Sequence, residues 1–355
     1  MNFKTTIIFP LLTIVFFLLI LELVFYFLPV SGDFDFNEVN EENQIFHAKE
    51  NNKVITSKFW DFYNPQKINI NNYGFRNDND YFKNKDNVVS IIGDSYVEAT
   101  QVEYNETFMN VFDEKIDKKY NVYSFGFSGA PLSQYLKWAD YSIKVFNSKH
   151  LVFNIVGNDF DESLLKYKSS KGFHFFDDCE ETLCYVLIPY KKKKYRWIIK
   201  SNFVRYLIFN VQILNLKEKV IRELNIIKNK DYYISNTVFS SNKEREDDSK
   251  NAINFFFDEV DSLNLKKKNI YFIVDGRFYE NKIIENSYGF IMREYFLKKC
   301  KLKNYNCIDM KKYFDKHYKI NQKRFSFERD AHWNKTAHEL VGKKLSEKFK
   351  KVNLD

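Results

Sequence analysis

The sequence is poor in cysteine and has no pattern that marks a zinc site. Its four cysteines form two close pairs, Cys179/Cys184 and Cys300/Cys307, and neither pair has C-x-x-C spacing. No histidine is placed to complete a zinc-binding set with them, so we expect no metal. The chain also lacks internal repeats and any recognised nucleic-acid-binding motif, which disfavours a nucleic-acid partner.

Apolar residues and lysine, by contrast, are abundant. The chain has 355 residues, 45% of them hydrophobic, which is enough for a sizeable core and excludes wholesale disorder. The net charge is +8, and lysines and arginines are spread along the whole sequence. A basic balance favours anionic partners in general. Solvated lysines on surface helices account for the same charge, and we favour this explanation.

One long apolar run lies at the amino terminus, over residues 7–30. A membrane-spanning helix needs about 20 such residues. Lys4 precedes the run, and five acidic residues follow it before the next lysine: Asp33, Asp35, Glu38, Glu41 and Glu42. The positive-inside bias then predicts a single-pass anchor over residues 1–30, with its amino terminus in the cytoplasm and the remaining chain outside. A cleaved signal peptide is the alternative, but Phe-Leu-Pro-Val-Ser-Gly matches its cleavage site poorly.

Two further expectations depend on this outward topology. In an extracytoplasmic compartment, periplasmic or extracellular, both cysteine pairs favour local disulfides, whereas in a reducing one they would be ordinary thiols. Glu22 lies inside the apolar run. A carboxylate there either marks a helix partner in the membrane or stays neutral or snorkels near the outer boundary, and we favour the latter.

Beyond the anchor, the chain divides into a polar and aromatic segment, 31–85, and a segment with alternating strand and helix patterns, 86–352. Residues 31–85 have no long periodic stretch and predict a loosely structured, membrane-proximal linker. In 86–352 we expect strands at 88–92, 122–125, 151–156, 270–274 and 307–310, and helices at 106–118, 132–146, 252–263, 287–297 and 336–349. This alternation predicts an α/β domain with a parallel sheet and right-handed crossovers.

The alternation is interrupted over residues 161–250, which we interpret as an insertion that caps the sheet. The insertion contains the first cysteine pair, a basic and aromatic run at 191–197, an apolar, helix-like stretch at 203–216 and a charged loop at 241–250. Basic and aromatic residues beside an apolar helix suit an anionic membrane surface. A cap packed on the domain, with solvated lysines, is the other explanation, and we favour it.

Polar and glycine-rich turns follow three of the expected strands. These turns are Gly93-Asp94-Ser95, residues 126–129 and Gly157-Asn158-Asp159, and a fourth polar segment, with Asp330 and His332, precedes the last helix. In a doubly wound sheet the carboxyl ends of the strands meet at one edge, which is the usual place for a site. We therefore expect these side chains to lie together.

The residues of this edge match what serine-based acyl transfer requires. A serine nucleophile needs a base within hydrogen-bond reach, and the base needs an acid to orient it. We predict Ser95 as the nucleophile, His332 as the base and Asp330 as the acid. Fixed donors for the oxyanion come from the backbone N–H groups of Ser95 and Gly129 and from the Asn158 amide. Taken singly, Ser95 suits a helix cap and Asn158 a turn at least as well.

In this order, the four blocks resemble those of the SGNH, or GDSL-like, superfamily of esterases and acyltransferases, over about residues 86–352. The resemblance implies a flavodoxin-like three-layer sandwich with a five-stranded parallel sheet. A reaction through an acyl-Ser95 intermediate needs neither a metal nor an organic cofactor. The resemblance also implies Asp330 as the triad acid, and four name-giving positions: Ser95, Gly129, Asn158 and His332. Only one residue separates the acid from the histidine here, whereas most of the superfamily has two. This Asp-x-His-Trp form is similar to a subset that includes membrane-associated polysaccharide O-acetylation proteins.

These observations lead to one principal hypothesis and one from another class. The first is a membrane-anchored serine esterase or O-acyltransferase that acts on acylated carbohydrate, or another envelope ester, through an acyl-Ser95 intermediate. A transferase would also need a multi-span partner that delivers the acyl donor, because this chain has a single apolar span. The alternative is a non-catalytic glycan-binding or assembly protein that retains the fold. A complete Ser-His-Asp set argues against the alternative.

Overall fold

The structure, a computed structural model, describes residues 3–192, 196–215, 242–276 and 287–353. At its centre is a sheet of β3 (Val88–Gly93), β4 (Asn121–Gly126), β5 (His150–Ile155), β8 (Ile270–Val274) and β9 (Asn306–Asp309). The strands lie in the order β4-β3-β5-β8-β9, and every neighbouring pair is parallel. In chain order this is 2-1-3-4-5, the flavodoxin-like order. The predicted α/β fold with a five-stranded parallel sheet is confirmed.

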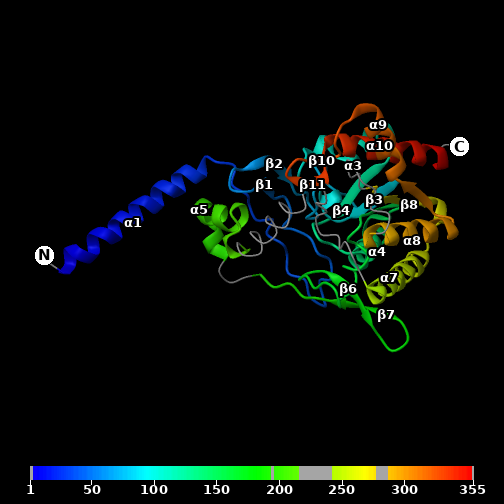
Figure 1. Cartoon of the computed structure of the whole chain (residues 1–355), viewed down its shortest axis with the longest axis horizontal. Coiled ribbons are helices and arrows are strands. Elements are labelled where there is room, and N and C mark those ends of the chain that lie inside the picture. Colours follow the sequence, from blue (N-terminus) through cyan, green and yellow to red (C-terminus); the bar gives the residue numbers. More distant parts are fainter. Residues whose placement is uncertain (1–2, 193–195, 216–241, 277–286, 354–355) are drawn as a thin grey trace.

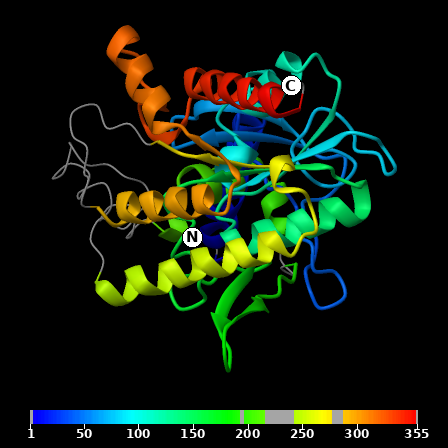
Figure 2. The same ribbon diagram turned by 90° about the vertical axis from the view of Figure 1, so that its right-hand side faces the viewer.

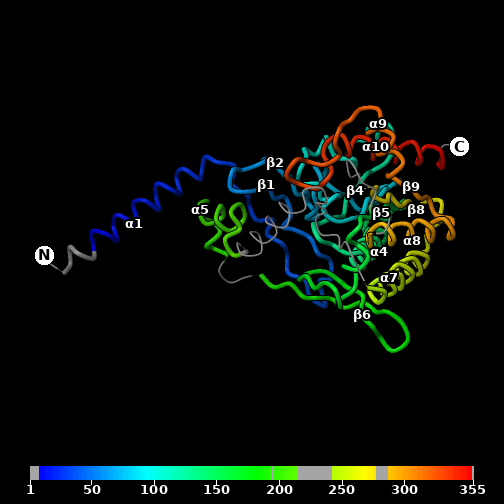
Figure 3. The backbone as a smooth tube through the Cα atoms, viewed as in Figure 1, coloured from blue at the N-terminus to red at the C-terminus, as the bar shows by residue number. Residues whose placement is uncertain are grey.

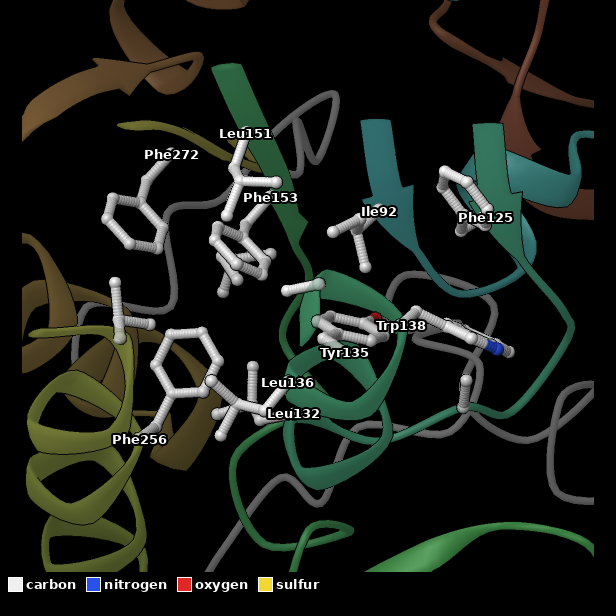
Figure 4. Packing of buried hydrophobic residues seen from close by; sticks show 14 of the residues in the cluster. Ile92, Phe125, Leu132, Tyr135, Leu136, Trp138, Leu151, Phe153, Phe256 and Phe272 are labelled. Atoms are coloured by element: carbon white, nitrogen blue, oxygen red, sulfur yellow. The ribbon is translucent and has the colours of Figure 1, made fainter. Parts of the chain in front are cut away.

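Helices cover both faces of the sheet and make three layers (Figure 2). Successive side chains of a strand point to opposite faces, so one face of β5 contributes Phe153 to one core cluster and the other contributes Val152 to a second. The first cluster lies under α4 (Leu132–Phe146), α7 (Lys243–Asp261) and α8 (Tyr288–Leu302), and Figure 4 shows Phe153, Ile92 and Phe125 facing Tyr135 and Trp138 of α4. The second lies under α3 (Phe108–Lys115), α9 (Lys311–Asn321) and α10 (Lys335–Asn353).

The helix that follows the insertion begins earlier than expected. Residues 241–250 were predicted as a loop, but α7 begins at Lys243, and Asn242 caps it by accepting a hydrogen bond from the Arg245 N–H at 2.9 Å. Most of the charged residues that suggested a loop are lysine, glutamate or arginine, which are good helix formers, and acidic residues are also favourable in the first turn of a helix. The helix predicted at 106–118 is shorter: Thr107 caps α3 (Phe108–Lys115), after a short 3₁₀ turn at Tyr104–Glu106. The pattern also gave no sign of α9 or of the short hairpin β10 (Ser326–Phe327) and β11 (Asp330–Trp333).

The amino-terminal helix α1 (Phe3–Tyr26) extends away from the rest of the chain (Figures 1 and 3). Its residues Ile8–Tyr26 are long and apolar enough to cross a membrane, and none of that window is buried within the chain. The expectation for Glu22 was wrong. The Glu22 carboxylate accepts hydrogen bonds from Ser201, Asn202 and Phe203, because the start of a later helix lies against it.

Residues 31–85 are not loosely structured, contrary to our prediction. They form the antiparallel hairpin β1 (Lys53–Lys58) and β2 (Tyr63–Asn69), and they bury Val39, Phe46 and Phe75 in the first core cluster. The indole of Trp138 donates to the Phe46 carbonyl at 3.1 Å. These contacts join residues far apart in the sequence, and such packing leaves no local periodicity to detect. The division of the chain at residue 86 stays a prediction.

Besides the first turns of α7, the insertion at 161–250 contains two groups of described elements. The first is the hairpin β6 (His174–Asp178) and β7 (Leu183–Leu187), closed by the Cys179–Cys184 disulfide and packed against α4. The second is a run of short helical turns: η2 (Arg196–Lys200), α5 (Asn202–Arg205), η3 (Tyr206–Asn210) and η4 (Ile213–Asn215). Residues 193–195, within the predicted basic run, and 216, the end of the predicted apolar stretch, lie outside the described residues. The other cysteine pair, Cys300–Cys307, is also bonded, as predicted.

Candidate active site

Tight packing at the end of β3 fixes the position of Ser95. All residues of β3 are buried, and Asp94 then caps the short helix α2 (Ser95–Glu98) by accepting a hydrogen bond from the Tyr96 N–H at 3.0 Å. A Cβ on Gly93 would lie 2.5 Å from the Val97 side chain, and one on Gly126 of the neighbouring strand 2.8 Å from it. Only glycine allows α2 to approach the strands this closely. Ser95 does begin a helix, but Asp94 supplies the cap.

Ser95, His332 and Asp330 form a continuous chain of hydrogen bonds. The Ser95 Oγ lies 2.9 Å from the His332 Nε2, and the His332 Nδ1 lies 2.5 Å from the Asp330 Oδ1. Since a carboxylate only accepts, the histidine carries its proton on Nδ1 in this arrangement, and Nε2 is free to accept the serine proton. The Ser95 hydroxyl has a second neighbour, the Asp94 Oδ2, at the longer distance of 3.2 Å.

The single residue between Asp330 and His332 is explained by strand β11. Residues two apart in a strand share one face, so Asp330 and His332 point the same way with only Ala331 between them. The carboxylate also accepts the His332 backbone N–H at 3.2 Å. The sequence analysis predicted no strand in this polar segment, so it gave no geometric reason for the short spacing.

A lysine that the sequence reading did not include lies on the other side of the acid. The Asp330 Oδ2 accepts a hydrogen bond from the Lys58 ammonium at the end of β1. Asp330 is 8% exposed, and burial opposes its ionisation. The hydrogen bonds and positive charges of His332 and Lys58 outweigh burial, and they hold the pKa of Asp330 well below its usual range. No local signal pointed to Lys58, since 272 residues separate the partners.

Two aromatic side chains hold the histidine ring in place. Tyr96, next to Ser95, lies with its ring centroid 5.2 Å from that of His332, and its hydroxyl donates to the Ala331 carbonyl at 3.3 Å. Trp333 packs edge-on against Tyr96 at 4.8 Å, and its indole N–H donates to the Asp275 carboxylate at 3.1 Å. The tryptophan of the Asp-x-His-Trp segment therefore ties β11 to the turn after β8.

The predicted oxyanion residues Gly129 and Asn158 lie in the turns after β4 and β5, which flank β3 in the sheet. Gly129 has a φ of +81°, a conformation that favours glycine. The Asn158 amide donates to the Glu162 carboxylate at 2.9 Å, and Lys168 bonds to both Glu162 and the Gly129 carbonyl. Among the described residues, neither Gly129 nor Asn158 makes a hydrogen bond to Ser95. They share its edge of the sheet and are connected to each other through Lys168 and Glu162.

Buried carboxyl groups position the loops of this edge. Glu98 accepts hydrogen bonds from the N–H and hydroxyl of Ser128, the residue before Gly129, and burial raises its pKa. Asp159 accepts the Val156 N–H at 2.8 Å and the Tyr135 hydroxyl at 3.1 Å, and burial also raises its pKa well above the usual value. Sequence reasoning included neither Glu98 nor Glu162, because an isolated glutamate in a helix or loop carries no distinguishing pattern.

No group of three His, Cys, Asp or Glu side chains that could hold a metal ion occurs within 3–192, 196–215, 242–276 and 287–353. All the polar contacts described above are made between side chains and backbone groups of the chain itself. What the arrangement offers chemically is a serine hydroxyl, an imidazole nitrogen aligned to accept its proton, and an ionised acid behind the imidazole.

Comparison with known proteins gives distant structural similarity only. No family model matches the chain, and no curated protein matches it significantly. The structure is similar to that of an acetyl xylan esterase, AlAXEase, with a TM-score of 0.42 and 12% identity over 73% of this chain and 98% of that one. It is also similar to the psychrotrophic esterase EstA from Pseudoalteromonas sp., with a TM-score of 0.39 and 12% identity over 76% of this chain and 100% of that one.

A third similar structure is the lipase/acylhydrolase from Enterococcus faecalis, with a TM-score of 0.41 and 9% identity over 75% of this chain and 96% of that one. TM-scores this low describe a distant similarity, whereas the strand order and register establish the fold directly. The chain therefore has the flavodoxin-like α/β fold that its resemblance to the SGNH superfamily implies, and Ser95, His332 and Asp330 are in hydrogen-bond contact at the carboxyl edge of its sheet.

Proposed function

We propose that this protein is a membrane-anchored serine esterase or O-acyltransferase that acts on acyl esters of envelope carbohydrate. The single observation that carries the proposal is the hydrogen-bonded series Ser95–His332–Asp330. A serine that only caps a helix has no need of an imidazole 2.9 Å from its Oγ or of an ionised acid behind that imidazole. In the same proposal α1 is the membrane anchor, its amino terminus is cytoplasmic, and the sheet domain lies in the periplasm or outside the cell.

The reaction proceeds in two acyl-transfer steps. The Ser95 Oγ attacks the ester carbonyl while the His332 Nε2 takes its proton, and a tetrahedral oxyanion forms. As the bond between the carbonyl carbon and the ester oxygen breaks, His332 returns that proton to the departing sugar oxygen and the acyl group stays on Ser95. A water or a second sugar hydroxyl then attacks the acyl-Ser95 with His332 again as the base. Asp330 holds the imidazole in the required tautomer and stabilises its charged form.

The oxyanion is stabilised by the N–H groups of Ser95 and Gly129 and by the Asn158 amide. The amide nitrogen of an asparagine carries two hydrogens, so one can stay on Glu162 and orient the group while the other points at the oxyanion. Lys168, bonded to Glu162 and to the Gly129 carbonyl, holds these two donors in a fixed relation. Donors that are fixed in advance stabilise the transition state without reorganisation.

Lys58 acts as a positioning residue for the acid. It occupies the carboxylate oxygen that the histidine does not use, so the side chain of Asp330 is held at both oxygens. The positive charge keeps the carboxyl ionised in spite of its burial. A neutral acid would lose the tautomer control on which the serine depends.

The identity of the second nucleophile distinguishes hydrolysis from transfer. Water gives an esterase, and a sugar hydroxyl gives an O-acyltransferase. A transferase at the outer face of a membrane would obtain its acyl group from a multi-span partner, since the described chain has one span. Incubation of the acyl-enzyme with a glycan acceptor, followed by mass measurement of the glycan, separates the two.

A serine-directed fluorophosphonate probe tests the proposal on the full chain in detergent. We expect the wild type to be labelled and Ser95→Ala to remain unlabelled. Ser287→Ala is the matched control, because Ser287 caps α8 by accepting the Phe290 N–H and, within the described residues, makes no hydrogen bond to Ser95, His332 or Asp330. It should label as the wild type does. A folded wild type that takes up no label would instead support a non-catalytic glycan-binding or assembly protein with this fold.

A further inference from the structure

Exposed apolar side chains gather on the segments next to the outer end of α1. Besides Phe27 and Leu28, which directly follow α1, and Ile55 of β1, there are five of them: Trp60 (66% exposed), Trp197 (67%), Ile198 (39%), Ile213 (45%) and Leu214 (80%). Four of them belong to the short helical turns η2 to η4, residues 196–215, which we call the collar. Figures 1 and 3 show α5, within the collar, beside the end of α1. The fifth, Trp60, is joined to the collar because its carbonyl accepts the Tyr206 hydroxyl at 3.0 Å.

The collar is fastened to α1 through a carboxylate in the apolar helix. The Glu22 oxygens accept the Ser201 hydroxyl at 2.6 Å, the Asn202 N–H at 2.7 Å, the Asn202 amide at 2.7 Å and the Phe203 N–H at 3.1 Å. Aromatic contacts continue along the helix, where the Phe25 ring lies 4.4 Å from that of Tyr206. A carboxylate in a spanning helix is tolerated when it is paired, and the first turn of α5 supplies that pairing.

This attachment sets the depth of the collar relative to a membrane. Glu22 precedes the last residue of α1, Tyr26, by four positions, which is roughly 6 Å along a helix axis. The start of α5 is therefore level with the final turn of the apolar helix, below its outer end. If α1 spans a bilayer, the collar lies within the interfacial layer of the outer leaflet.

The chemistry of the collar suits that layer. Tryptophan is enriched where a membrane meets water, because its ring is amphipathic. The acidic residues Asp33 and Asp35, which follow α1, are paired with Arg196 of the collar and do not face the bilayer as free charges. The exposed Lys191 and Lys200 flank the collar and provide positive charge for anionic headgroups.

We infer that the collar and Trp60 form a membrane-docking surface that inserts into the interface of an anionic bilayer beside α1. This inference rests on α1 as the membrane anchor of the proposed function. Docking at two places, a spanning helix and a collar, fixes the orientation of the domain in a way that a single helix does not.

The docked orientation also keeps the candidate site near the membrane. The Ser57 hydroxyl donates to the carbonyl of Pro29, just beyond α1, at 2.6 Å, and the Asn210 amide of the collar donates to the same hydroxyl at 2.9 Å. The residue after Ser57 is Lys58, whose ammonium group donates a hydrogen bond to Asp330. One residue of chain and one lysine side chain thus separate the membrane exit from the triad acid, a distance of at most about 18 Å.

Quenching of tryptophan fluorescence by brominated lipids tests the surface directly. The full chain has four tryptophans, none of them in α1, and Trp138 and Trp333 are buried in the domain. For the test, the full chain is reconstituted in vesicles of phosphatidylethanolamine and phosphatidylglycerol, with or without bromine at carbons 6 and 7 of the acyl chains. Bromine should reduce the emission by about a third in the wild type and by less than about a tenth in Trp60→Phe/Trp197→Phe, because interfacial tryptophans lie beside the brominated carbons.

A matched variant separates docking from mere exposure. Leu302, the last residue of α8, is 66% exposed. Figure 1 shows α8 on the side of the domain opposite α1. In the double-phenylalanine background, Leu302→Trp restores an exposed tryptophan that bromine should not quench. Equal quenching of the wild type and the double variant overturns the inference, and so does failure of the protein to float with the vesicles. Fluorophosphonate labelling of the same samples reports on Ser95 separately, so failure of the docking surface is distinguishable from failure of the proposed activity.

Discussion

The carboxyl edge of the sheet and the hairpin β1–β2 both supply a residue to the cluster around Asp330 and His332, but they hold these residues differently. Ser95 follows a fully buried strand and is fixed by close packing at Gly93. Lys58 is the last residue of β1, and its side chain is 39% exposed. Its neighbour Ser57 is hydrogen-bonded to the Pro29 carbonyl and to the Asn210 amide of the collar. The comparison suggests that the edge supplies the reacting groups and the hairpin adjusts the acid behind them. Four substitutions test this division.

The largest effect is expected at the edge itself. Among the described histidines, only His332 lies within hydrogen-bond reach of the Ser95 Oγ. His332→Ala removes this base, and ester turnover should fall by at least about 1,000-fold. Initial-rate assays with an activated acyl ester measure this turnover. His317→Ala is the control, since His317 lies on α9 and packs against Phe325, and it should keep wild-type turnover. Comparable losses in both variants would contradict the assignment of the base.

The next largest effect is expected at the acid. Asp330→Asn keeps the size of the side chain but offers the histidine an amide, so the tautomer is no longer controlled and turnover should fall by about 100- to 10,000-fold. The depressed pKa of Asp330 also has a consequence for folding. Its ionised form stabilises the folded chain above the pKa of an ordinary, unfolded carboxyl, about 4, and this stabilisation is lost as the pH falls further.

The pH dependence separates the two roles of Asp330. Urea unfolding at pH 7 should show Asp330→Asn to be less stable than the wild type by about 1–3 kcal/mol, because Lys58 loses its charged partner in a largely buried setting. Below about pH 4 the difference should shrink, because the carboxyl of the unfolded wild-type chain takes up a proton there while the folded chain, with its lowered Asp330 pKa, does not yet do so. A stability difference that stays constant as the pH falls below that value would show that the charge of Asp330 is not its source.

A smaller effect is expected at the hairpin. Lys58→Met removes the cation but keeps much of the side-chain stem, and turnover should fall by about 5- to 20-fold, far less than at the edge. The low-pH limb of the rate profile should move to higher pH, because the Asp330 carboxylate is then less neutralised. Lys58→Arg keeps the charge and should restore most of the rate. A purely structural lysine would leave the profile in place.

The smallest effect on turnover is expected where the hairpin meets the collar. The buried Asn210 amide donates to Ser57 and Phe59, and its oxygen accepts the Ser31 N–H at 3.0 Å. Asn210→Ala leaves these groups unpaired and should lower the unfolding free energy by about 1–3 kcal/mol. Turnover should fall by no more than about threefold, because Lys58 loses only indirect support. A loss as large as that of Lys58→Met would show that the collar and the site are coupled more tightly than the comparison suggests.

Local sequence patterns located all five strands of the sheet to within one residue at each end. Each strand is a short, apolar, β-branched or aromatic run between turns, and a run of this kind is typical of a buried strand. The same patterns were weaker where polar residues form helices, as in the first turns of α7, since exposed helical turns and loops share one composition. They were uninformative over residues 31–85, where a hairpin and scattered aromatic residues pack into the core without any period.

The candidate site divides in the same way. The sequence by itself determined the order of the blocks that carry Ser95, Gly129, Asn158 and Asp330/His332, because parallel strands bring their carboxyl ends to one edge whatever surrounds them. Only the tertiary structure decided that β11 is a strand, that Lys58 lies on Asp330 and that Glu22 holds the collar. The partners in these last two contacts are 272 residues and about 180 residues apart. Such contacts form when separate helices and strands pack against one another. The residues next to each partner in the sequence therefore do not predict them.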